Sequence, residues 1–325
     1  MPTLKDKSII VTGGAGFIGS HLVDRIIEEK PRRIVVLDNF FLGTRENLQP
    51  AANRFPGLVI EDCDVTDYQK TKKILTENEA DVVFDLAVIP LPVSLEKPEW
   101  TFQHNVDMTV NLCRLGREKH YETLVHFSSS EVYGTARQTP MDENHYLGAI
   151  TTYAASKAAG DQLVLSYHAM GYLDALVVRP FNNYGPRQND KSYAGVIPLT
   201  INRILDDQPP ILHGDGHQTR DYLYVTDTAD ATVRLYEEPK TRGQVVNIAS
   251  GQEVTIRHIV QTIAQEMGNR QPIRHEPQRP GDVDRHLGDI KLAQELIGFQ
   301  PTVDIDDGLQ RTVDWYAQQR EKIRA

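Results

Sequence analysis

The chain has 325 residues, of which 40% are hydrophobic and 25% are charged, a composition typical of globular proteins and not of disordered or repetitive ones. Its 45 acidic residues outnumber its 35 basic residues and give a formal net charge of −10, which disfavours nucleic acids and anionic membranes as partners. The two cysteines, Cys63 and Cys113, form no CxxC motif, so we expect no metal site and a reducing, cytoplasmic location. No run approaches the ~18 apolar residues of a membrane helix, and the first residues lack the apolar stretch of a signal peptide.

The first half of the chain alternates short apolar runs with longer amphipathic segments. The runs, which we predict to be strands, cover residues 8–11, 34–37, 58–60, 82–86, 124–127 and 176–178. Segments 20–30 and 106–119 have apolar residues at helical spacing. Apolar strands that alternate with helices indicate a parallel sheet covered on both faces, so we predict an α/β fold with a Rossmann-type doubly wound sheet.

The second half differs in composition, with loops rich in proline and glycine, short strands and two or three helices, among them 256–267 and 290–296. We therefore predict two domains. Residues 1–179 form the sheet domain and carry the catalytic residues, and residues 180–325 form a smaller α/β domain that mainly binds substrate. The boundary between them can be interleaved.

A glycine-rich turn follows the first predicted strand. Gly13, Gly16 and Gly19 have the spacing GxxGxxG, and the absence of Cβ atoms there permits a tight turn that a pyrophosphate can approach. Asp38 ends the second strand, where a carboxylate can accept hydrogen bonds from both hydroxyls of an adenosine ribose. No arginine follows Asp38 directly, so the pattern predicts a dinucleotide site that prefers NAD to NADP.

Further cofactor contacts are expected from the same turn and from the ends of later strands. Asp64 and Val65 are placed to lie beside the adenine, although a solvated loop carboxylate is the alternative for Asp64. The other candidates are Phe17, Ile18, Asn39, Leu86 and Ala87.

A second motif pairs a tyrosine with a lysine. Tyr153 and Lys157 are four residues apart, which places both side chains on one face of a helix. There the ammonium can stabilise a phenolate and make Tyr153 a usable base near neutral pH. The string SSSEVYG over residues 128–134 supports this prediction because it lies at the carboxyl end of the fifth strand, the edge where open α/β sheets bind ligands.

In this order, TGGAGFIGSHL, SSSEVYG, YAASK and RPFNNYGPRQ resemble the extended short-chain dehydrogenase/reductase family of nucleotide-sugar epimerases and dehydratases. GDGHQTRDYLYVTDT and QRPGDVDRHLGD extend the resemblance over nearly the whole chain. The resemblance implies that NAD is held tightly, takes a hydride from C4 of the sugar and later returns it. It further implies that Tyr153 is the base, that Lys157 is its partner and a ligand of the NAD ribose, and that Ser129 binds the sugar O4.

The resemblance also implies a nucleotide-diphosphate sugar as the substrate. Asn182 matches a position that contacts the diphosphate. Arg220 and Arg279 match arginines that bind the phosphates, and they would give this acidic protein a local basic pocket. Asp282 matches a carboxylate bonded to the nucleotide ribose. Arg187 is a further candidate, with a surface salt bridge as the alternative.

Contacts to the sugar are expected from Ser94, in a proline-containing segment after the fourth strand, and from Ser130. Packing within that segment is the alternative role for Ser94. The resemblance implies a homodimer as well, and the helices near 106–119 and after residue 154 carry apolar residues on more than one face, as a four-helix interface requires.

The reaction that follows C4 oxidation depends on Glu131. On an extended strand end it would point to the same side as Ser129, where a carboxylate suits proton removal from C5. We therefore favour a sugar-nucleotide 4,6-dehydratase, although Ser130 stands where dehydratases of the family have an aspartic acid. The alternatives are a UDP-sugar 4-epimerase, then a UDP-glucuronate-type decarboxylase, and remotely a non-catalytic NAD-binding sensor.

Overall fold

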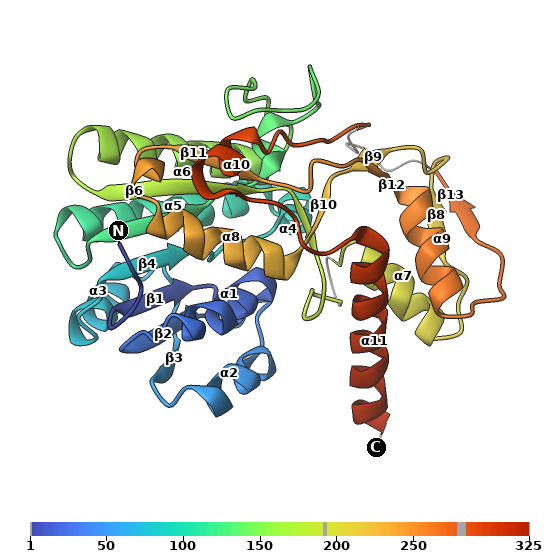
Figure 1. The fold of residues 1–325 in the computed structure, drawn as a ribbon, viewed down its shortest axis with the longest axis horizontal. Helices are drawn as coiled ribbons and strands as arrows, with labels where there is room; N and C mark the ends of the chain where they lie inside the picture. The colour runs from blue at the N-terminus through green and yellow to red at the C-terminus, as the bar shows by residue number, and fades with distance from the viewer. Residues whose placement is uncertain (1, 191–193, 278–283, 325) are drawn as a thin grey trace.

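The computed structural model describes residues 2–190, 194–277 and 284–324. Its centre is a seven-stranded sheet in the order β11-β6-β5-β4-β1-β2-β3, in which all neighbouring strands are parallel (Figure 1). The strands are β1 (Ser8–Thr12), β2 (Arg33–Asp38), β3 (Leu58–Asp62), β4 (Val82–Asp85), β5 (Thr123–Phe127), β6 (Asp174–Pro180) and β11 (Val245–Ile248). The predicted doubly wound α/β fold is confirmed.

Helices cover both faces of this sheet because its strands are apolar on both sides. The helices are α1 (Phe17–Glu28), α3 (Tyr68–Glu77), α5 (Pro98–Arg117), α6 (Thr152–Ala169) and α8 (Val225–Glu237). Helices α1 and α8 share one buried cluster with Ile9 and Val11, whereas α3, α5 and α6 share another with Ile10. Successive residues of β1 therefore enter opposite cores, as alternation along a strand requires.

The connections reverse direction beside β1. This strand lies between β2 and β4, so the chain builds one half of the sheet on each side of it. At such a point the loops after the two neighbouring strands diverge and leave a crevice at their carboxyl ends. The crevice is where the site described below lies.

A smaller part of the molecule, on the right in Figure 1, has its own core. Its strands pair as β7 with β10, β9 with β12 and β8 with β13, and helices α7, α9 and α11 contribute Ile201, Ile263 and Val313 to a buried cluster. The bounds are β7 (Asn182–Tyr184), α7 (Val196–Leu205), β8 (Ile211–His213), β9 (Thr219–Arg220), β10 (Tyr222–Tyr224), β12 (Val254–Thr255), α9 (Ile256–Glu266), β13 (Arg274–Glu276) and α11 (Ile305–Arg324).

The chain beyond residue 180 contributes to both parts. After β10 it returns to the large sheet as α8 and β11, and later α10 (Lys291–Ile297) packs Ala293 into the same cluster as α1. Within the described residues this half has five α-helices, so our expectation of two or three was too low. Helix α7 follows a loop that contains proline and glycine, and α8 begins directly after β10, so neither has a separate start signal in the sequence.

The short helices are α2 (Gln49–Arg54) and α4 (Leu91–Glu96), with 3-10 turns at Arg45–Leu48, Ser130–Tyr133 and Pro239–Thr241. Helix α1 begins three residues earlier than predicted, within the glycine turn, and α5 begins at Pro98 rather than at residue 106. No helix in the described part of the chain is long and apolar enough to cross a membrane.

Candidate active site

A cavity of about 380 Å³ opens at the carboxyl ends of the central strands. The glycine turn forms its floor, and two of the glycines are required there by the backbone. Gly13 has φ +64°, and a Cβ on it would lie 2.8 Å from the backbone nitrogen of Ala87. A Cβ on Gly19 would overlap the carbonyl oxygen of Gly13. The turn is thus a cradle that side chains would fill, at the N-terminus of α1, and it fits a pyrophosphate.

Asp38 closes one end of this cavity. Its carboxylate accepts hydrogen bonds from the backbone nitrogens of Ala15 (2.9 Å) and Phe40 (2.8 Å), so it is held firmly at the end of β2. Burial raises its pKa, and the two backbone hydrogen bonds act in the opposite direction. The neighbouring Asn39 donates to Asp64 at 3.1 Å. This arrangement fits a ribose with two free hydroxyls.

The structure brings most of the predicted cofactor contacts together. Those that line the cavity are Gly13, Gly16, Phe17, Ile18, Gly19, Asp38, Asn39, Val65, Leu86, Ala87, Tyr153 and Lys157. Asp64 is not among the lining residues and instead accepts hydrogen bonds from Asn39 and from both the backbone and the side chain of Thr66.

The catalytic group predicted from the sequence lines the same cavity. Ser129, Tyr153 and Lys157 all line it, and a hydrogen bond links the Ser129 hydroxyl to the Tyr153 phenol. Helix α6 places Tyr153 and Lys157 one turn apart, and Thr151 caps its N-terminus by accepting from Ala154 N at 3.1 Å. Geometry therefore joins one hydroxyl from the end of β5 with two side chains of α6.

The environment of Tyr153 favours the neutral phenol. Burial raises the pKa of Tyr153 to about 12, the hydrogen bond to Ser129 acts in the opposite direction, and the carboxylates of Glu131 and Asp161 raise it further. Burial lowers the pKa of Lys157, whereas Asp85 and Asp161 raise it. A charged lysine beside the phenol is what would make Tyr153 available as a base closer to neutral pH.

Glu131 lies beside this group, but not for the reason that the sequence suggested. Residues 130–133 form a 3-10 turn, so the alternation of an extended strand does not apply at this point. The Ser129 hydroxyl begins the turn by accepting from the backbone nitrogen of Glu131 at 3.2 Å. Glu131 nevertheless acts electrostatically on Tyr153, although it is not among the residues that line the cavity.

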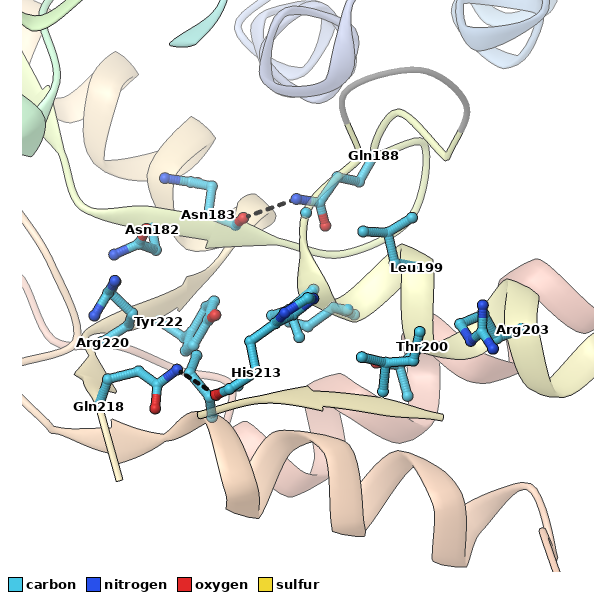
Figure 2. A pocket seen from close by; sticks show the side chains of 15 residues that line it. Asn182, Asn183, Gln188, Leu199, Thr200, Arg203, His213, Gln218, Arg220 and Tyr222 are labelled. Carbon is cyan, nitrogen blue, oxygen red and sulfur yellow. Dashed lines mark hydrogen bonds between the residues drawn. The ribbon is translucent and has the colours of Figure 1, made fainter. Parts of the chain in front are cut away.

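A second cavity, of about 430 Å³, adjoins the first and shares Asn183 and Gln188 with it. Figure 2 shows Asn182 and Arg220 at one end of this cavity, Arg203 at the other, and Tyr222 and His213 between them. The carbonyl oxygen of Asn183 accepts from Gln188, and that of His213 accepts from Gln218 at 3.2 Å, so loops and strands of the smaller part are joined around it (Figure 2). Two arginines and several amides make this cavity suitable for an anionic, hydrogen-bonding ligand.

Only some of the predicted substrate contacts line a cavity in the structure. Asn182 and Arg220 line the second cavity. The guanidinium of Arg187 instead lies 2.7 Å from the carboxylate of Asp24 on α1. Ser94 is buried within α4, where it donates to the carbonyl oxygen of Leu91 at 2.6 Å, and Ser130 is buried in the turn after β5. Arg279 and Asp282 lie outside the described residues.

Several lining residues were not predicted. Phe41, Leu42 and Gly43 follow Asp38 along the first cavity, and His213 and Tyr222 line the second. The strings HGDGHQ and TRDY gave a signal for the last two, because turn residues that flank short strands often line ligand sites. Phe41 carried no such signal.

Comparison with known proteins agrees with this geometry. The model of the NAD dependent epimerase/dehydratase family matches residues 9–249. The chain belongs to this family. A putative UDP-glucose 4-epimerase of Methanocaldococcus jannaschii is 35% identical over 94% of this chain and 97% of its own length.

Solved structures give the same assignment. The UDP-N-acetylglucosamine 4-epimerase of Methanobrevibacter ruminantium is 34% identical, with a TM-score of 0.89 over 97% of this chain and 99% of that one. The dTDP-glucose 4,6-dehydratase of Streptomyces venezuelae, solved with NAD, is 29% identical, with a TM-score of 0.90 over 97% and 98% of the two chains. Decarboxylases of nucleotide-sugar uronates are also among the similar proteins.

This member of the epimerase/dehydratase family is therefore an enzyme that uses NAD. The predicted family, enzyme class and cofactor are confirmed. The glycine cradle, the buried Asp38 and the cavity between them are the features of this chain that would hold the dinucleotide. The names of these relatives give different reactions, namely 4-epimerisation, 4,6-dehydration and decarboxylation.

Proposed function

We propose that the enzyme is a nucleotide-sugar 4-epimerase. The observation that carries this proposal is that Ser129, Tyr153 and Lys157 line the same cavity as the glycine cradle. It is supported by relatives at 35% identity whose names are UDP-glucose 4-epimerase. The sequence alone favoured a 4,6-dehydratase, and these relatives, together with Ser130, now favour the epimerase.

The chemistry at C4 needs few protein groups. Ser129 binds and orients the 4-hydroxyl, and Tyr153 removes its proton as the carbon is oxidised. Lys157 stabilises the phenolate during this step. NAD, which the glycine cradle and Asp38 would hold, would supply the hydride chemistry, the removal of the hydride from C4 and its return to the opposite face of the ketone. Tyr153 then gives the proton back to the new 4-hydroxyl.

Ser130 supports the epimerase over the dehydratase. A 4,6-dehydratase must protonate the departing 6-hydroxyl, and a serine is a poor acid. Ser130 is also 3% exposed and is not among the residues that line the first cavity. An epimerase needs no such acid, because the ketone only has to turn over in the site.

Because of Glu131, a reaction that removes the proton from C5 is the second candidate function. The carboxylate of Glu131 follows Ser129 by two residues and acts electrostatically on Tyr153. A base at that position could remove the acidified C5 proton, as dehydration requires, and relatives include both dehydratases and decarboxylases.

We further propose that the nucleotide diphosphate occupies the second cavity. Asn183 and Gln188 belong to both cavities, so one extended ligand can place its hexose near Tyr153 and its nucleotide near Arg220. The arginine would bind phosphate oxygens in a chain whose net charge is otherwise unfavourable for anions.

Incubation with UDP-, dTDP-, GDP- and CDP-sugars, followed by NMR in deuterated water, tests the proposal. An epimerase inverts C4 and leaves solvent deuterium out of the carbon skeleton. Deuterium at C5 with loss of the 6-hydroxyl would replace the proposal by the dehydratase. Release of carbon dioxide from a uronate would replace it by the decarboxylase.

Replacement of the base gives a direct prediction. Tyr153→Phe should lower kcat by at least about 10²-fold, the scale expected when a positioned base is lost, while the Kd of the nucleotide sugar changes little. Steady-state kinetics and calorimetry measure the two quantities. Near-native turnover would remove Tyr153 from the mechanism.

Glu131→Gln separates the two candidates. In a 4-epimerase this change should alter kcat only modestly, because no proton leaves C5. If Glu131 is instead a C5 base, deuterium exchange at C5 should fall by about 10²-fold or more. Reduced cofactor absorbing near 340 nm would then still appear, since C4 oxidation does not need Glu131.

A further inference from the structure

Behind the catalytic group lies a buried row of polar side chains that the scheme above does not use. It begins on β1, where Thr12 donates to Asp85 at 2.9 Å. On β5, His126 Nδ1 lies 2.7 Å from the other oxygen of Asp85. The far side of the same imidazole, Nε2, lies 3.7 Å from the carboxylate of Asp161 on α6. The row therefore joins three central strands, β1, β4 and β5, to the helix that carries Tyr153 and Lys157.

Helix α6 packs directly on this row. Gly160 makes the approach possible, since a Cβ there would lie 3.1 Å from His126 Nε2 and 3.3 Å from the hydroxyl of Thr109. Lys157 is one turn before Asp161 and only 6% exposed. Its ammonium consequently needs a counter-charge within the protein, because water does not supply enough solvation.

The two carboxylates of the row differ in their charged partners. Asp161 is paired with a cation, because Arg179 donates to its Oδ2 at 2.6 Å, where Ser128 also donates at 2.7 Å, whereas its Oδ1 has no hydrogen-bond partner among the described residues. In the same part of the chain, the donors to Asp85 are the hydroxyl of Thr12 and the imidazole of His126. Two carboxylates and two cations balance in this row when Arg179 is matched with Asp161 and Lys157 with Asp85.

We propose that Asp85 is a positioning residue that acts through Lys157, holding the buried lysine charged beside Tyr153. This inference rests on the proposed role of the tyrosine and lysine in C4 oxidation. Asp85 touches neither sugar nor nicotinamide in this scheme. It is fixed between a hydroxyl of β1 and an imidazole of β5, and it supplies the negative charge that the lysine lacks.

The charged groups around Lys157 support a fall in its pKa when the charge of Asp85 is removed. Burial lowers the pKa of Lys157, and Asp85 and then Asp161 raise it. The other titratable groups in the row are His126 and Arg179. Asp85 also acts electrostatically on Cys113 of α5. The carboxylates of Glu131 and Asp161 raise the pKa of Tyr153. Loss of the Asp85 charge should therefore let Lys157 lose its proton at lower pH.

The test is Asp85→Asn in the NAD-bound protein, which keeps the size of the side chain and its bond to Thr12. Trace labelling of amines with acetic anhydride across pH 6–11, read by mass spectrometry of the Lys157 peptide, reports the lysine without needing turnover. We expect the labelling midpoint to fall by one pH unit or more. The alkaline limb of the kcat profile should move by the same amount, with KM for the nucleotide sugar unchanged.

Two variants separate charge from structure. Asp85→Glu keeps the charge and should keep a midpoint near that of the wild type, even if it lowers the melting temperature. Asp227→Asn removes a carboxylate of α8 that is 5% exposed and bonded to Thr302, and it should leave the midpoint unchanged.

The inference and the proposed function fail in different ways. An unchanged Lys157 midpoint in folded Asp85→Asn would overturn the inference, and so would wild-type labelling that already shows a neutral lysine at pH 7, a result that needs no variant. If the labelling shifts but no nucleotide sugar is turned over, or if Tyr153→Phe remains active, the proposed function fails instead.

Discussion

Asp38 shows how one side chain can select a cofactor. It is 7% exposed at the end of β2, and both of its oxygens accept from backbone nitrogens. A 2′-phosphate would place further negative charge against this fixed carboxylate, and the residues that follow, Asn39, Phe40 and Phe41, offer no cation to offset it.

We therefore expect the protein to bind NAD at least about tenfold more tightly than NADP, which corresponds to a difference of about 1.4 kcal/mol in binding free energy. Calorimetry on cofactor-free protein measures both affinities. Asp38→Asn should narrow the difference, whereas Asp64→Asn, which changes a carboxylate that does not line the cavity, should leave it intact. Equal affinities in the wild type would contradict the assignment.

For single residues, the sequence predicted the position of a side chain correctly where local backbone geometry determines that position. The glycine spacing and the pair Tyr153 and Lys157 depend on local periods, and the structure brings both to one cavity. Glu131 could not be placed by alternation, because a hydroxyl cap on Ser129 turns the chain immediately after β5. Arg187 could not be placed either, since its partner Asp24 lies on a helix far away in the sequence.

At the scale of elements, a single loop connects α1 with both cavities. Residues 185–190 contact α1 through His21, whose Nε2 lies 3.0 Å from the carbonyl oxygen of Pro186, and through the ion pair of Asp24 with Arg187. The same loop carries Gln188, which lines both cavities. The contact therefore fixes the wall between the predicted cofactor and nucleotide sites.

His21 should make this contact sensitive to acid. Burial, with Arg187 acting in the same direction, lowers the pKa of His21 to about 4, below its ordinary value near 6.5. The unfolded chain thus binds more protons between these values, so the free energy of unfolding should fall as the pH drops from 6.5 towards 4. The contribution of His21 is at most about 3.5 kcal/mol, since its pKa is lowered from 6.5 to about 4 and each pKa unit corresponds to about 1.4 kcal/mol.

Chemical denaturation of the wild type and of His21→Gln across pH 4–8 measures this contribution. The glutamine can still donate to Pro186 but does not take up a proton, so the variant should lose less stability on acidification. His286, whose pKa burial also lowers to about 4, leaves a residual slope in both proteins. Parallel curves for the two proteins would show that His21 does not contribute.

Element boundaries were predicted less well than element types. Six of the seven strands of the large sheet contain continuous apolar runs, so their positions followed from the sequence. Helix α5 begins at Pro98 because proline suits the first turn of a helix, yet the polar residues that follow mask its start. Strand β11 was missed because it is short and its partner β6 lies far earlier in the chain.

For the whole molecule, the exposed face of α5 supports the homodimer expected from the sequence. Phe102 and Val110 are 38% and 39% exposed on this helix, eight residues apart and therefore on nearly one face. Helix α6 packs beside α5, so two copies can form a four-helix interface.

We expect the wild type to sediment as a dimer at micromolar concentration and the double variant Phe102→Asp, Val110→Glu to sediment as a monomer, because charges in an apolar interface are strongly unfavourable. Met170→Ser, which removes an apolar side chain 60% exposed at the end of α6, serves as a control and should remain a dimer. A monomeric wild type in sedimentation velocity would exclude the interface.

The return of α8 and β11 to the large sheet limits where the chain of this enzyme can be divided into separate parts. The polypeptide passes from β6 into the smaller lobe, comes back through β10 and α8, and leaves again after β11 (Figure 1). A protein cut after residue 180 would lack the outermost strand of its sheet and a helix that covers it. Engineers who wish to exchange the smaller part for that of a relative must therefore graft separate inserts between retained segments, because a simple carboxyl-terminal fusion would leave the first half incomplete.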